Sequence, residues 1–284
     1  MPPLERVVYR REGVEIGAFR CPPQRSDFRR AGPIRDHCAF VFPRTAVRIR
    51  HEGVPAFAAD AGTVTFYNPG QPYERELLDP AGDCCEWFAL PAPVAAEVAQ
   101  AVDAGAGDEG APLRFTHGPS DARTYLHQRA LFAALERGHA LDPLTVEEAL
   151  LGLLASVLRQ AAAARGERER GRSDLLSGRE RRAVEAARAL LARDFRRPLT
   201  LEHVARAVGL SRYRLCRAFR TATGTTLHAH RDHLRLRAAL DPLSGGCADL
   251  TSLALDLGYS SHSHFSERFR HAFGLTPSQA RARL

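Results

Sequence analysis

A row of arginines between residues 212 and 220 has the chemistry to bind anions. The guanidinium group presents N–H donors in a planar fork that matches phosphate oxygens and the edge of guanine. Side chains three or four residues apart lie on one face of a helix. Behind Ser211, the exposed face expected here holds Arg212, Tyr213, Arg214, Cys216, Arg217 and Arg220. We take Arg217 as the best candidate to contact guanine and Arg220 as a candidate phosphate contact.

A second polar run carries different donors and acceptors. It holds Ser261, His262, Ser263, His264, Glu267, Arg268 and Arg270. Glu267 can accept a hydrogen bond from cytosine N4 but repels phosphate, so this run should discriminate more between bases and bind less tightly. The alternative is that Glu267 only pairs with a neighbouring arginine such as Arg270.

Both runs belong to a pattern that the chain repeats. Gly209 recurs as Gly258 at an offset of 49 and Phe219 as Phe269 at an offset of 50, so the second copy has one extra residue after its turn. Each copy predicts a short helix, a glycine turn and a second helix with one apolar face. Serine caps are expected before the second helices, at Ser211 and Ser260.

The segment between the copies predicts the spacing of the two motifs. Residues 227–240 form a helical run of fourteen residues, about 21 Å long. With two helix radii added, it can place the two second helices about 34 Å apart, one turn of DNA. One helix-turn-helix pattern would be a weak signal, but the repetition favours a DNA-binding domain.

Residues 178–284 resemble the DNA-binding domain of the AraC/XylS family of bacterial transcription regulators. The matching residues are Ala205, Gly209, Ser211, Leu215, Phe219, Gly224, Arg237, Ala238, Ala254, Gly258, Tyr259, Phe265, Phe269 and 274–277. The resemblance implies a regulator that reads two adjacent major grooves of double-stranded DNA, with RNA polymerase as a candidate partner. It places Tyr213, Cys216 and Arg217 at base-contacting positions. Glu267 departs from the family pattern, which often has a basic or polar residue there.

The charge distribution agrees with this division of the chain. All 40 residues in the Lys+Arg count are arginine, and the formal net charge is +7. Residues 1–165 carry 18 Arg against 21 acidic residues, whereas residues 166–284 carry 22 against 12. A basic excess confined to the part with both motifs is typical of a polyanion-binding module.

Residues 1–112 predict a β-rich domain, so that the whole chain reads as a two-domain α+β protein. Short strands are expected at residues 6–9, 14–20, 39–42, 46–51, 62–67, 73–77 and 85–90, separated by Pro, Gly, Asn and Asp. Such spacing suggests a sandwich or barrel. The stretch 59–73 resembles the cupin-like sensor barrel found ahead of many AraC-type domains.

A small-molecule effector is the expected use of this domain. An aromatic wall with one or two arginines could take an organic anion, and the candidates are Arg48, Tyr73, Arg75, Trp87 and Phe88. They could equally be ordinary core and surface residues. Cupin enzymes hold a metal through clustered histidines, but His51-Glu52 has no second histidine beside it, and we read it as a surface pair at a strand end. No catalytic constellation, cofactor or metal site is predicted, and an enzyme fused to a DNA-binding domain is the weaker alternative.

The six cysteines include no CxxC pair, which disfavours a structural zinc site. Neighbouring residues of a strand point to opposite faces, so Cys84 or Cys85 could join Cys21 or Cys38 in a sensor for an oxidant or soft metal. The default is that they are small buried side chains. A DNA-repair protein with a four-cysteine site is not supported by the spacing.

Residues 113–165 turn helical. Apolar stripes on helices expected at 122–137 and 146–165 exceed what one helix on the sensor domain would bury, which favours a homodimer interface; packing on that domain is the alternative. Residues 166–177 predict a mobile, charged linker. With no secretory signal and no apolar run of transmembrane length, we expect a cytoplasmic protein. The sequence does not say whether it activates or represses.

Overall fold

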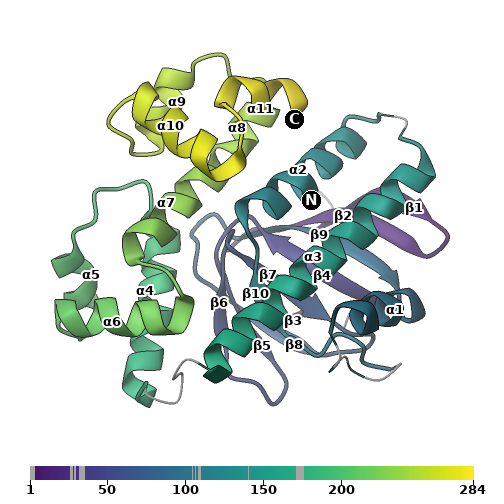
Figure 1. The fold of residues 1–284 in the computed structure, drawn as a ribbon, viewed down its shortest axis with the longest axis horizontal. Helices are drawn as coiled ribbons and strands as arrows, with labels where there is room; N and C mark the ends of the chain where they lie inside the picture. Colours follow the sequence, from purple (N-terminus) through teal and green to yellow (C-terminus); the bar gives the residue numbers. More distant parts are fainter. Residues whose placement is uncertain are drawn as a thin grey trace. The chain divides into compact units, whose positions relative to one another are not determined.

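The computed structural model describes residues 4–25, 28, 30–31, 36–103, 105, 107, 110–139, 141–170 and 176–284. The chain forms two compact units, Met1–Ala164 and Arg165–Leu284 (Figure 1). Within the described residues, no helix is long and apolar enough to cross a membrane.

The first unit is β-rich, as predicted. Its strands are β1 (Glu5–Arg11), β2 (Val14–Cys21), β3 (Arg30–Ala31), β4 (His37–Pro43), β5 (Val47–His51), β6 (Phe57–Ala59), β7 (Thr63–Tyr67), β8 (Tyr73–Leu77), β9 (Asp83–Pro91) and β10 (His117–Pro119). They pair as two sheets, β1-β2-β9-β4-β7-β10 and β3-β8-β5-β6. Among the described strands, no hydrogen-bonded strand pair joins the two sheets. The closed barrel expected from the sequence is therefore not seen.

Because side chains alternate along each strand, one face of the larger sheet packs against helices and the other against the smaller sheet. Phe40, Phe42 and Phe88 lie on the face that packs against α2 (Ala122–Glu136), where the Phe42 and Tyr125 rings are 6.3 Å apart. Ala39, Val41, Tyr67 and Ala89 lie on the opposite face, against Tyr73 of the smaller sheet. The space between the sheets is therefore lined by alternate residues of each strand.

Helices α1 (Ala92–Val102), α2 and α3 (Pro143–Arg170) cover the face of the larger sheet that carries Phe40, Phe42 and Phe88 (Figure 1). The α3 stripe of Leu150, Leu153, Leu154, Val157 and Leu158 is buried within the chain. On β10, a Cβ at Gly118 would lie 2.6 Å from the Ala161 side chain, so α3 approaches the sheet closely. The apolar surface that suggested a dimer interface is thus largely used in packing on the first unit.

Helix α3 continues to Arg170, into the segment expected to be a mobile linker. Residues 171–175 of that segment lie outside the described residues. The second unit then consists of α4 (Gly178–Asp194), α5 (Leu201–Ala207), α6 (Arg212–Thr223), α7 (Leu227–Ala238), α8 (Leu240–Ser244), α9 (Leu250–Asp256), α10 (His262–Phe273) and α11 (Pro277–Arg283).

The helix pairs α5–α6 and α9–α10 are the two copies of the repeated motif. Their turn glycines, Gly209 and Gly258, have φ of +67° and +84°, the left-handed conformation predicted for them. The predicted helix at 227–240 differs in one respect, because Ala239 interrupts it between α7 and α8. The connecting helix is therefore about 18 Å long rather than 21 Å.

Candidate functional site

Helix α6 presents the predicted arginine row to solvent. It begins after Ser211, whose Oγ accepts a hydrogen bond from the Arg214 N–H at 3.3 Å. Leu215, Ala218 and Phe219 are buried. The remaining predicted residues are exposed, namely Arg212, Tyr213, Arg214, Cys216, Arg217 and Arg220. At 77% exposure, Tyr213 is a large aromatic side chain held in water, as a contact to a partner would require.

Helix α10 presents the second polar run in the same way. Its buried side chains are Phe265, Phe269 and Phe273. The cap is Ser261, whose Oγ accepts from the His264 N–H at 3.2 Å, and not Ser260 as the sequence suggested. The extra residue of the second copy therefore precedes the cap. At this register, His262, Ser263, His264, Glu267 and Arg270 occupy the positions of the exposed α6 residues.

Arg268 differs from the other predicted contacts. It corresponds to the buried Ala218 of α6 and reaches inward to Asp232 of α7, which accepts from its Nε at 2.9 Å and its Nη2 at 2.6 Å. Its role in the structure is to join α10 to α7. The position that the sequence reasoning missed is Ser266, the counterpart of Cys216, which an offset of 50 would have found.

Glu267 is exposed on α10. In the part of the chain that the structure describes, Glu267 and Arg270 make no ion pair with each other, so the pairing of Glu267 with Arg270 is not observed.

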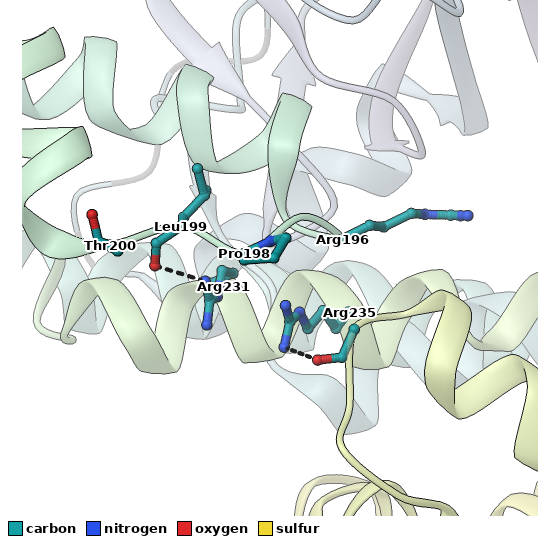
Figure 2. A pocket seen from close by; sticks show the side chains of 7 residues that line it. Arg196, Pro198, Leu199, Thr200, Arg231 and Arg235 are labelled. Carbon is teal, nitrogen blue, oxygen red and sulfur yellow. Dashed lines mark hydrogen bonds between the residues drawn. The ribbon is translucent and has the colours of Figure 1, made fainter.

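Two arginines of α7 donate hydrogen bonds to backbone carbonyls beside both motifs. Arg231 Nη1 donates to the Leu199 carbonyl at 3.2 Å, and Arg235 donates to the carbonyls of Phe195 at 2.7 Å and Gly258 at 2.8 Å. Figure 2 shows these side chains around the pocket lined by Arg196, Pro198, Leu199, Thr200, Arg231, Arg235 and Gly258. A Cβ at Gly258 would lie 2.6 Å from the Arg196 carbonyl oxygen, so glycine is required there. These contacts fix both motifs relative to α7.

Comparisons with known proteins agree with this geometry. Residues 204–283 match the family described as "Helix-turn-helix domain". Regulatory protein SoxS of Salmonella typhimurium is 40% identical over 87 residues, which is 31% of this chain and 81% of SoxS. The chain belongs to the AraC/XylS family of transcription regulators. It is a DNA-binding protein of that family.

Solved structures of the family are also similar. An AraC-type regulator from Chromobacterium violaceum is 30% identical, with 37% of this chain and 95% of that chain covered and a TM-score of 0.35. ToxT from Vibrio cholerae is 11% identical, with 96% and 99% covered and a TM-score of 0.35.

The N-terminal unit of this AraC/XylS protein separates the five predicted effector residues. Tyr73 and Trp87 are half-buried and pack between the sheets. Arg75 is also buried, but its guanidinium donates to Asp83 at 3.1 Å and to the Phe28 carbonyl at 2.6 Å. Arg48 lies near Glu76 at 3.6 Å on the exposed face of the smaller sheet, and Phe88 packs beneath the helices. Of the five residues, the structure therefore brings Tyr73, Trp87 and Arg75 to the space between the sheets, where the Arg75 guanidinium is already bonded to Asp83 and Phe28.

His51 is not the surface residue that the sequence suggested. It is 1% exposed and stacks on the rings of Tyr67 at 5.0 Å and Tyr73 at 6.3 Å, while Glu52 beside it is exposed. Burial lowers the pKa of His51 to about 4, so the ring is neutral at pH 7. Within the described residues, no three His, Cys, Asp or Glu side chains are placed to hold a metal ion.

None of the cysteines that the structure describes forms a disulfide bond. Burial raises the pKa of Cys38 to about 12 and that of Cys85 well above its ordinary value. A reactive sensor cysteine needs the opposite shift, because the thiolate is the reactive form. These environments favour the role of small buried side chains for Cys38 and Cys85.

Proposed function

We propose that this AraC/XylS regulator reads two successive major grooves of double-stranded DNA with α6 and α10, under the control of a small molecule in its N-terminal unit. The observation that carries the first part is the pair of exposed polar helices attached to one connecting helix. Side chains on α6 would supply both phosphate contacts and base readout. Residues Ser263, Ser266 and Glu267 of α10 would take the corresponding positions in the neighbouring groove.

Arg217→Ala is expected to weaken binding to the operator about 5- to 150-fold, because a bidentate contact to guanine contributes about 1 to 3 kcal/mol. The operator is first selected from random DNA with the full chain, and affinities are measured for every single-base variant. One base pair should lose its preference. If the ranking of the variants is unchanged, Arg217 does not read a base.

Arg220→Ala is the matched control, since it removes an arginine one turn further along the same helix. As a phosphate contact, it should weaken all sequences alike and reduce the slope of log affinity against log salt by about 0.9. If Arg220→Ala instead loses preference at one base pair, Arg220 reads a base and is not only a phosphate contact.

Two unpaired donors support the effector site. The Nδ1 atom of His51 lies 2.8 Å from Gln71 Nε2, and the amide oxygen of Gln71 accepts from the Asn68 N–H. The Gln71 amide therefore donates to Nδ1, which leaves the hydrogen of the neutral ring on Nε2. Among the described atoms, His51 Nε2 and Trp87 Nε1 are buried without a hydrogen-bond partner. Both pack around Tyr67 and Tyr73, so an effector with acceptor oxygens and a flat apolar body would suit this interior.

Trp87 is the single tryptophan of the chain, so its fluorescence reports on this site directly. Titration with a library of aromatic carboxylates and phenols is expected to find a saturable change in emission that tracks a change in operator affinity. Trp87→Phe keeps a ring but removes the donor, and it should weaken that ligand about 3- to 10-fold, the loss of one hydrogen bond. A compound that changes operator affinity but not Trp87 emission would place the effector site elsewhere.

The proposed homodimer rests on the sequence pattern alone, because the α3 stripe is used within the chain. Leu144, at 62% exposure near the start of α3, is the large apolar side chain that remains available there.

A further inference from the structure

Glu180 lies in the first turn of α4, outside both helix-turn-helix motifs, yet it contacts the proposed DNA-reading helix. Its Oε1 accepts from Arg217 Nη2 at 3.2 Å and from Arg214 Nη2 at 3.3 Å. Its Oε2 accepts from the backbone N–H of Ser177 at 3.0 Å and from the Ser177 hydroxyl at 2.9 Å. Both carboxylate oxygens are therefore occupied, and the residue is 2% exposed.

This carboxylate stays charged. The backbone and side-chain hydrogen bonds from Ser177, followed by those from Arg214 and Arg217, lower the pKa of Glu180 to about 2. Serine at the cap and glutamate three residues later form a capping box, which fixes Glu180 on the rigid start of α4. The two arginines are thus held by a negative charge that is itself immobilised.

The contact leaves most of each guanidinium available to DNA. The Arg214 and Arg217 side chains are 51% and 54% exposed, and only the Nη2 atom of each is within hydrogen-bond distance of Glu180. A guanidinium has five N–H groups, so the remaining donors of Arg217 can still form a two-point contact with a base. An arginine already held in one orientation loses less rotamer freedom when it binds.

We propose that Glu180 is a positioning residue for DNA readout, which holds Arg217, with Arg214 beside it, in the orientation that meets one base pair. This inference rests on the proposed role of Arg217. The second motif lacks the equivalent pair, because Glu267 occupies the position of Arg217. The alternative is that Glu180 merely reduces the positive charge presented to DNA.

Glu180→Gln separates these two roles. Glutamine at this position can also complete a capping box, so the start of α4 is retained while the charge is lost. The matched control is Glu202→Gln, which removes one negative charge from an exposed pair with Arg206 at 2.7 Å on α5. The full chain and each variant are titrated with the operator and with the operator changed at the base pair that Arg217 reads.

Both variants should bind all DNA more tightly, since each removes a charge that repels phosphate. Glu180→Gln should also reduce the ratio of the two affinities about three- to tenfold, whereas Glu202→Gln should leave it unchanged. A wild-type ratio in Glu180→Gln overturns the proposal. If Arg217→Ala also retains the wild-type ratio, the base-reading role of Arg217 fails instead, so the two failures are distinguishable.

Two further variants separate an effect on base preference from an effect on the stability of the fold. Ser177→Ala removes the cap hydroxyl but keeps the Glu180 carboxylate and the backbone N–H that donates to it, so it should lower the melting temperature and reduce the ratio less than Glu180→Gln does. Glu180→Asp keeps the charge but shortens the side chain by one methylene. It should reduce the ratio without the general gain in affinity, and a normal ratio in a folded Glu180→Asp chain counts against the proposal.

Discussion

Replacing Glu86 with alanine is expected to lower the free energy of unfolding of the N-terminal unit by about 3 to 5 kcal/mol. Glu86 is fully buried on β9, where its Oε1 accepts from Arg44 Nη1 at 2.8 Å and from Arg129 of α2. Arg129 is itself 3% exposed. Removing the carboxylate takes the Glu86 anion away from the buried Arg129 guanidinium, and the desolvated positive charge is the main source of the loss.

Urea unfolding followed by Trp87 fluorescence measures this loss in the full chain, because the single tryptophan lies in the N-terminal unit. Glu76→Ala is the control. Its carboxylate lies 3.6 Å from Arg48 and 3.7 Å from Arg50 on the surface, where such pairs contribute at most about 1 kcal/mol. Equal losses in the two variants would show that burial of the Glu86 ion pair is not what makes it important.

The repeated motif could be predicted because its determinants are local. A glycine at each turn, a serine cap and aromatic residues at helical spacing specify α5–α6 and α9–α10 without reference to the rest of the chain. The errors come from register. The offset of 49, continued beyond the turn, predicts Ser260 as the cap, whereas the structure has Ser261 there. The same register puts Arg268 on the exposed face, although its counterpart is the buried Ala218.

In the N-terminal unit, the sequence located strands but did not assign their faces. The predicted pocket contains both Trp87 and Phe88, although neighbouring strand residues point to opposite faces. The same alternation groups His51 with Val47 and Ile49, which predicts burial and would have corrected its placement at the surface. The strands β3, β6 and β10 were missed because they are short, with two or three residues each.

Glu180 could not be found from the sequence at all. It lies 34 and 37 residues before the arginines that it contacts, and only the packing of α4 against α6 brings them together. A capping-box glutamate is a local feature of many helices, so its type and position gave no signal of a second role. Sites of this kind depend on tertiary packing, so the sequence of α6 alone does not reveal them.

Asp232 is the residue whose loss should most disturb the DNA-binding unit. Its carboxylate on α7 is 5% exposed and accepts from the Tyr259 hydroxyl at 2.8 Å as well as from two nitrogens of Arg268. Tyr259 adjoins the turn between α9 and α10, and Arg268 lies within α10. One side chain therefore attaches both helices of the second motif to the connecting helix.

Asp232→Ala is expected to lower the free energy of unfolding of this unit by about 3 kcal/mol, since it leaves the buried Tyr259 hydroxyl without an acceptor and Arg268 without its anion. The Arg268 side chain is 36% exposed, so water can solvate part of its charge and the loss should fall at the lower end for buried ion pairs. Thermal unfolding followed by far-ultraviolet circular dichroism measures the change. Asp249→Ala, which removes the exposed cap of α9, is the control and should cause a smaller loss.

The effect on DNA should be confined to one half of the operator. At temperatures where the Asp232→Ala chain is still folded, α6 remains packed on α4 and α7, and Arg231 still holds the Leu199 carbonyl before α5. The second motif keeps the Arg235 bond to the Gly258 carbonyl, but α10 loses the Asp232 contacts that join it to α7. Base preferences in the half read by α10 should weaken, and those in the half read by α6 should persist. Equal weakening of both halves would mean that the two motifs do not depend on separate anchors along α7, and unchanged preferences in both would mean that α10 is positioned by its apolar face alone.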